Sequence, residues 1–237
     1  MNAIESLPSY EKFIGVHEGE TACIFGAGTS VANQDFSFTS KYIQISVNSS
    51  ILLMDWELGL KHNRYWVSND SGVLRWDYWK KVIGYSCNRI IRDSWKNCYN
   101  GFDLSDFYVF YPRPTAEDII NPEDKGLAYC SSVPTSLDLA IQMGCKRIFL
   151  FGVDQYFKNG KSHYWQYWPE ENQPKRGFQS NPNSENNQKN TFDYNRKAFK
   201  ALRLFADGKK VDIFNCNTFS KVEYFNKISI DDARKIL

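Results

Sequence analysis

The sequence predicts an α/β sandwich with a mostly parallel central sheet, formed as a single domain over residues 1–237. Short apolar runs, typical of buried strands, alternate along the chain with segments whose apolar residues recur at helical spacing. A glycine turn follows the first run, and 42% of the 237 residues are hydrophobic, which is enough for a sizeable core. Residues 155–190 are rich in Asn, Gln, Pro and aromatic residues, which predicts a long lid loop.

The first half of the chain contains five short apolar runs that predict strands. The first run ends in the glycine turn Gly26–Ser30, the second ends at Asn48, and a polar turn containing Asn69 closes the third. The five predicted strands are Thr21–Phe25, Lys41–Val47, Arg64–Val67, Asn88–Arg92 and Phe107–Tyr111.

The second half of the chain contains the clearest helix signal. Ser131 provides a cap, Pro134 lies in the first turn, and the apolar stripe that follows ends at Gly144. Lys146–Phe151 then predicts a further strand. The other expected elements are a helix that carries Val73, Trp76, Trp79 and Val82, a helix from Phe192 to Ala206, a strand Val211–Phe214 and a short helix near Asp231.

Composition excludes several classes of protein. The 29 Lys and Arg residues and 27 Asp and Glu residues leave a net charge of +2, and the chain has no run of like charge. We therefore expect no nucleic acid among its partners. The six cysteines have no CxxC spacing, so we expect reduced thiols and neither a zinc knuckle nor a redox motif. No apolar stretch approaches the ~20 residues of a membrane helix, and no secretory leader is recognisable. We therefore expect a cytoplasmic protein without an integral membrane segment.

Glycines and polar residues follow several of the predicted strands. Ligands of parallel sheets bind at the carboxyl ends of the strands, so these positions are candidate ligand contacts. They are Gly26, Gly28, Ser30, Asn48, Asn69, Gly152 and Asp154. The glycine turn either brings backbone N–H groups to a phosphate or packs against a neighbouring segment, and Asp154 either accepts ribose hydroxyls or serves a turn. NAD and S-adenosylmethionine sites favour an acidic residue at the position that Asn48 occupies, so the sequence disfavours both of these ligands.

The lid segment carries the candidate catalytic side chains. Aromatic residues crowd its start, where they either stack on a sugar nucleotide or pack the lid; they are Tyr156, Tyr164, Trp165, Tyr167 and Trp168. His163 is the histidine near the strand ends, and an imidazole suits a general base because its ordinary pKa is near neutrality. The chain has no Asp-x-Asp, a common metal-binding motif of sugar-nucleotide enzymes, so we expect no metal site.

Three blocks of the sequence carry a resemblance to a known group of proteins. The blocks are His17–Ser30, then Ser131 and Ser132 followed by Lys146–Tyr156 and Asn159–Gly160, and finally Asn190–Thr191 with Asn215–Ser220. Together they resemble the DUF115/MptE-like Rossmann group, which includes the bacterial sialyltransferases of glycosyltransferase family 42.

The resemblance implies a Rossmann-like fold and a metal-independent, inverting glycosyltransferase without a cofactor. Such an enzyme moves a sugar from a CMP-linked nucleotide sugar to a glycan hydroxyl. The resemblance implies that the nucleotide and its phosphate are surrounded by Gly28, Ser30, Asn48 and Asn69. It also implies that the cytidine ribose and base are held by Ser131, Ser132, Gly152 and Asp154. Tyr156 and Tyr164 match tyrosines that support the departing phosphate.

Several alternatives stay open at this level. The family's catalytic histidine precedes the helix after the lid, where this chain has Asn187–Asn190, so His163 is the candidate base and Glu185 or Asp193 are the alternatives. An Mg²⁺-dependent pyrophosphokinase of the MptE type and a non-catalytic nucleotide- or glycan-binding module are the alternative functions. The expected partners are a nucleotide sugar and a glycan acceptor, and a homo-oligomer is compatible with the sequence.

Overall fold

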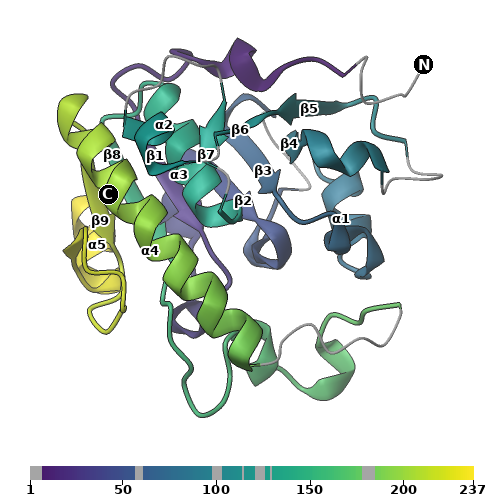
Figure 1. Ribbon diagram of the computed structural model, residues 1–237. Helices are drawn as coiled ribbons and strands as arrows, with labels where there is room; N and C mark the ends of the chain where they lie inside the picture. Colours follow the sequence, from purple (N-terminus) through teal and green to yellow (C-terminus); the bar gives the residue numbers. More distant parts are fainter. Residues whose placement is uncertain are drawn as a thin grey trace.

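The computed structural model describes residues 7–56, 61–97, 103–113, 115–120, 126–128, 130–177 and 185–237, with the side chains of 96–97 and 185–190 left out. Its centre is a sheet of eight strands in the order β10-β9-β8-β1-β2-β3-β4-β5, and every neighbouring pair is parallel (Figure 1). The strands are β1 (Thr21–Phe25), β2 (Ile43–Val47), β3 (Arg64–Ser68), β4 (Asn88–Arg92), β5 (Phe107–Phe110), β8 (Arg147–Phe151), β9 (Asp212–Asn215) and β10 (Asn226–Lys227). The predicted α/β class with a mostly parallel sheet is confirmed.

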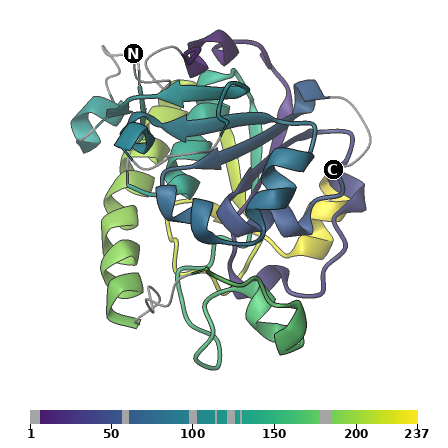
Figure 2. The same ribbon diagram turned by 90° about the vertical axis from the view of Figure 1, so that its right-hand side faces the viewer.

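Helices cover both faces of this sheet. On one face lie α2 (Ala116–Ile120), α3 (Ser132–Gln142) and α4 (Glu185–Gly208), and on the other lie α1 (Trp79–Gly84) and α5 (Ile230–Ile236). Figure 2 shows the strands between α4, in yellow-green, and α5, in yellow. A small parallel pair, β6 (Pro112–Arg113) with β7 (Leu127–Ala128), lies beside the main sheet.

The central strands are apolar because both of their faces are buried. Along β1, Ala22 and Ile24 join the core beneath α3 and α4, whereas Cys23 and Phe25 join the core beneath α1 and α5. Successive side chains of a strand point to opposite faces, and a parallel sheet covered on both sides therefore needs a continuous apolar run. This requirement explains why short apolar runs located most of the strands in the sequence.

Two predicted helices differ from the observed ones. The expected helix through Val73 and Val82 is divided into a 3-10 segment, Ser71–Arg75, and α1, because the Asp70 side chain caps Gly72 N–H and Trp76 pairs with Arg176 as an isolated bridge. The helix expected from Phe192 begins at Glu185, so α4 takes up the last six residues of the predicted lid. Glu, Gln and Lys are good helix formers, and this polar stretch extends a helix whose later turns are packed.

The loops after β1 and β8 cross in close contact. Gly26 N–H donates to the Phe151 carbonyl oxygen at 2.7 Å, and Gly28 N–H donates to the Gly152 carbonyl oxygen at 2.8 Å. A Cβ on Gly26 would lie 2.5 Å from the Gly152 oxygen, and Gly152 itself has a φ of +66°. The glycines therefore serve the packing of two backbones, which is one of the two roles that the sequence left open.

Replacing Gly26 by Ala should lower the free energy of unfolding by about 2 kcal/mol or more, because the clash is with a backbone oxygen that has no rotamer to escape through. Gly84→Ala is the matched control, since no heavy atom lies within 4 Å of a Cβ at Gly84 and Ala is the better helix former. Urea denaturation compares the two variants. Equal stability of both would contradict the account of the crossing.

Candidate active site

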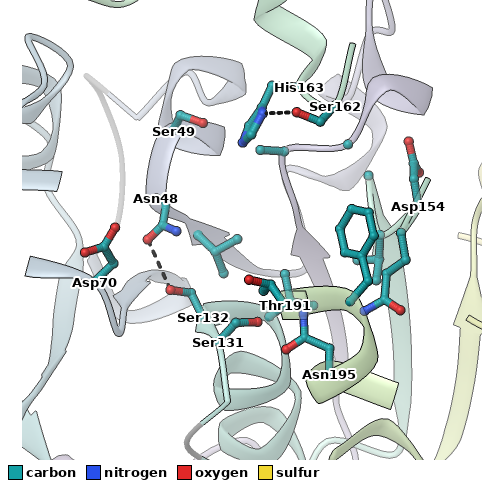
Figure 3. A pocket seen from close by; sticks show the side chains of 18 of the residues that line it. Asn48, Ser49, Asp70, Ser131, Ser132, Asp154, Ser162, His163, Thr191 and Asn195 are labelled. Carbon is teal, nitrogen blue, oxygen red and sulfur yellow. Dashed lines mark hydrogen bonds between the residues drawn. The ribbon is translucent and has the colours of Figure 1, made fainter. Parts of the chain in front are cut away.

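A cavity opens at the carboxyl ends of the strands, where the chain changes direction across the sheet. The strands β2 to β5 lie on one side of β1, whereas β8, β9 and β10 lie on the other. Loops that leave neighbouring strands in opposite directions create a crevice at this point, and α/β proteins bind ligands there. The cavity has a volume of about 360 Å³ and is lined from the loops after β1, β2, β3 and β8, the start of α3, the 162–176 segment and α4 (Figure 3).

Asp154 fastens the loops that form one wall of the cavity. Its carboxylate accepts hydrogen bonds from Ser30 N–H at 2.8 Å, Ser30 Oγ at 2.6 Å, Asn217 Nδ2 at 2.8 Å and Thr29 Oγ1 at 3.3 Å. The side chain is buried, and four donors of the protein occupy its acceptor positions. Its observed role is thus to join the segments after β1, β8 and β9, and contact with a ribose stays a prediction.

A chain of hydrogen bonds joins β2, β3 and α3 at another wall. Asn69 N–H donates to Ser132 Oγ at 3.0 Å, and Ser132 Oγ donates to Asn48 Oδ1 at 3.1 Å. Asn48 has a φ of +48°, a conformation that Asn adopts more readily than most residues. Figure 3 shows the Asn48 and Ser132 side chains facing each other at the cavity.

The amino end of α3 also meets the cavity. Ser131 is its N-cap residue and makes no side-chain capping hydrogen bond, and Ser131, Ser132 and Val133 all line the cavity. Free N–H groups and the dipole of a helix favour negative charge at this end. Arg176 lines the cavity too, and backbone hydrogen bonds that join Lys175 and Gly177 to Asp77 and Arg75 fix its segment there. This region can bind an anionic group.

His163 lies above these residues, with its Nδ1 2.8 Å from Ser162 Oγ and the rest of the ring directed into the cavity (Figure 3). Gln166 holds the backbone in place, since its Oε1 accepts from both Ser162 N–H and His163 N–H at 2.8 Å. Burial lowers the pKa of His163 to about 4, so the imidazole is neutral at neutral pH. The expectation of a pKa near the working pH is therefore corrected, although a neutral ring retains a lone pair for a proton.

Tyr164 has a different role from the one expected of it. Its hydroxyl is fully buried and donates to the Ser49 carbonyl oxygen at 2.8 Å, while its N–H donates to the Ala27 oxygen at 3.0 Å. Burial raises the pKa of Tyr164 well above its ordinary value, so the hydroxyl stays protonated. Trp165 Nε1 also donates, at 3.2 Å, to Ser49 Oγ. These contacts anchor the lid to the loops after β1 and β2, and Tyr164 does not line the cavity.

The cavity brings together most of the predicted site residues but not all of them. Those that line it are His163, Tyr156, Gly28, Asn48, Ser131, Ser132, Gly152 and Asp154. Those outside its lining are Tyr164, Gly26, Ser30 and Asn69. Of the alternative bases, Asp193 is exposed and paired with Arg196 at 2.9 Å, and the side chain of Glu185 lies outside the described residues.

Sequence reasoning missed several residues of the cavity. They include Asp70, Gln155, Arg176, Thr191 and Asn195. Asn195 carried a usable signal, because it interrupts an apolar face between Phe192 and Phe199 at helical spacing. Arg176 carried none, since nothing local distinguishes it from the surrounding polar lid.

The fold of this chain is similar to that of a solved glycosyltransferase. The sialyltransferase CstII from Campylobacter jejuni, in complex with the substrate analogue CMP-3FNeuAc, has a TM-score of 0.50 and 15% identity over 89% of this chain and 86% of that chain. CstII in complex with cytidine-5'-monophosphate has a TM-score of 0.49 and 17% identity over 90% and 86%. No family model and no curated protein sequence matches the chain. A shared Rossmann-like fold is shown, and the resemblance to the DUF115/MptE-like group stays a prediction.

No three His, Cys, Asp or Glu side chains in the described part of the chain are arranged to hold a metal ion. Among the same residues, no helix has both the length and the apolar character to cross a membrane.

The lowered pKa of His163 predicts a pH dependence of stability. The ordinary pKa of a histidine is 6.5, so below about pH 6.5 the imidazole of the unfolded chain binds a proton, whereas the imidazole of the folded protein does not. Stability that is present at about pH 7 is therefore lost as the pH falls toward about 4. The loss amounts to roughly 1–2 kcal/mol near pH 5. His163→Gln should lack this component, and urea denaturation of both proteins at about pH 7 and about pH 5 measures the difference. Parallel loss in the two proteins would contradict a half-buried imidazole that stays neutral in the folded protein.

Proposed function

We propose that the protein is a sialyltransferase-like glycosyltransferase that uses a CMP-linked sugar as donor and a glycan hydroxyl as acceptor. The observation that carries the proposal is the cavity at the β1/β8 direction change. The protein shares its fold with an enzyme whose structure was solved together with CMP-3FNeuAc. Its polar wall, with the amino end of α3, Asn48, Ser132 and Arg176, suits an anionic nucleotide sugar.

In the proposed reaction the acceptor hydroxyl attacks the anomeric carbon of the donor sugar. A new C–O bond forms on one face while the bond to the phosphate oxygen breaks on the other, which inverts the configuration and releases CMP. His163 takes the hydroxyl proton at Nε2, in the tautomer in which Nδ1–H donates to Ser162 Oγ. Tyr156 lines the cavity and is the candidate to support the departing phosphate.

Metal independence is a part of this proposal. The sequence lacks Asp-x-Asp, and the candidate partners for phosphate are hydroxyls, amides and one guanidinium. Purified protein given CMP-linked sugars and a panel of glycans should transfer sugar at an equal rate with and without EDTA. Complete loss on chelation, with rescue by Mg²⁺ and dependence on a nucleoside triphosphate, would instead favour the MptE-type pyrophosphokinase.

A matched variant separates binding from catalysis in the same experiment. His163→Gln retains a polar side chain of similar size, so CMP should still stabilise it, whereas transfer should fall by about 10²- to 10⁴-fold. A nucleotide at ~100 times its dissociation constant adds about 2.7 kcal/mol to the folded state, which a thermal shift detects. Absence of any CMP-induced shift in the parent would contradict the proposed function. Binding without turnover would favour the non-catalytic module.

A further inference from the structure

One face of α4 presents two phenylalanines and one asparagine to the cavity. Phe192, Asn195 and Phe199 follow one another at spacings of three and four residues, which places them on the same side of the helix. All three line the cavity. Phe199 is fully buried, and Asn195 retains only 7% of its exposure. A buried polar side chain thus shares one face of α4 with two phenylalanines at the cavity.

The Asn195 amide has an unused acceptor. Its Oδ1 is buried and receives no hydrogen bond from the described residues. Native proteins rarely leave such an atom without a partner, because a buried acceptor that has lost its water destabilises the fold. An oxygen in this state at a cavity wall can accept a hydrogen bond from a donor that enters the cavity.

Gln155 presents a second acceptor of the same kind. Its Oε1 is buried without a hydrogen bond from the described residues, and the side chain lines the same cavity. Its backbone has a φ of +55°, a left-handed conformation that Gly or Asn adopts at lower cost. A residue that is strained in its backbone and unpaired in its side chain contributes no evident stability. A functional role for the side chain explains why Gln stands there.

The segment that carries Gln155 contacts α4, which carries Asn195, through two phenyl rings. The Phe157 ring, two residues after Gln155, lies 5.8 Å from the Phe192 ring, one turn before Asn195. Figure 3 shows Asn195 and Thr191 on α4 toward one side of the cavity, and Asn48 and Asp70 toward the other. The α4 side therefore combines the phenyl rings of Phe192 and Phe199 with the Asn195 amide and the Thr191 hydroxyl. Aromatic side chains also line the cavity elsewhere, at Trp76, Tyr78 and Trp165.

The α4 side suits the base of a nucleotide. A flat ring with a polar edge packs against aromatic side chains and needs a few well-placed hydrogen-bond partners, whereas phosphate and sugar need many polar contacts. Two carbonyl oxygens without donors fit a ring that carries an exocyclic amino group, because such a group has two N–H bonds to donate. With both amides oriented as they are in this structure, a carbonyl at the same ring position, as in uracil, would face both oxygens with a third acceptor.

We propose that the α4 side of the cavity binds an amino-bearing nucleobase, with Asn195 Oδ1 and Gln155 Oε1 as the acceptors for its amino group. The proposal rests on the proposed function, since it names the residues that select the base of the nucleotide donor. It assigns base selection to α4 and to the residue after Asp154, and leaves the polar wall to phosphate and sugar.

Calorimetric titration with CMP and UMP tests the proposal, because the two nucleotides differ at the base edge by an amino group and a carbonyl. The parent should bind CMP at least tenfold more tightly than UMP. Asn195→Leu, which is close in size, and Gln155→Gly should each reduce the preference toward unity through a loss of CMP affinity. UMP affinity should change little.

Stability supplies the readout that a merely structural role would not give. Gln155→Gly relieves a left-handed backbone, and Asn195→Leu removes an unpaired buried oxygen, so both variants should unfold at urea concentrations equal to or above that of the parent. Asn159→Gly is the matched control, since Asn159 has a φ of +54° but is exposed and outside the cavity lining. It should retain the parental preference for CMP.

The outcomes are separable. If the parent binds CMP and UMP equally, or if both variants keep the parental preference, base selection by these amides is overturned. Loss of stability in Asn195→Leu and Gln155→Gly together with an unchanged preference would likewise overturn it, in favour of a structural role. If the parent binds neither nucleotide, the proposed function fails before base selection can operate.

Discussion

The arrangement of the cavity depends on the close crossing of the loops that follow β1 and β8. Only residues without a Cβ allow the two backbones to approach as they do at Gly26, Gly28 and Gly152. The four hydrogen bonds accepted by Asp154 then lock the crossing and attach the loop after β9 to it. Since the lid segment is in turn anchored through Tyr164 to the Ala27 oxygen, a shift at the crossing would displace His163 as well.

Much of this fold can be read from the sequence, because a parallel sheet buried on both faces demands uninterrupted apolar strands. The runs that become β1 and β4 match the observed strands residue for residue, and α3 has a cap and a terminal glycine to define its ends. The helix expected across Val73 and Val82 was wrong, because helical spacing also arises where a 3-10 segment and a short helix bury adjacent side chains. The two-residue strands β6, β7 and β10 depend on tertiary pairing and leave no periodic signal.

The candidate site was predictable in its position but less so in its chemistry. The rule of carboxyl ends located the cavity, and eight of the twelve predicted site residues line it. The rule could not show that the protein's own donors occupy the Asp154 carboxylate, or that Tyr164 is turned toward Ser49, because these contacts join residues 63 or more positions apart. The pKa of His163 also depends on burial by the folded lid, which a local sequence does not encode.

The proposed function requires the cavity at the β1/β8 direction change to hold a cytidine nucleotide. A crystal structure of the protein with CMP tests it most directly. We expect the base to lie against Phe192 and Asn195 on α4, and the phosphate to lie near Asn48, Ser132 and the amino end of α3. A nucleotide bound outside this cavity, or bound within it with base and phosphate exchanged, would contradict the account.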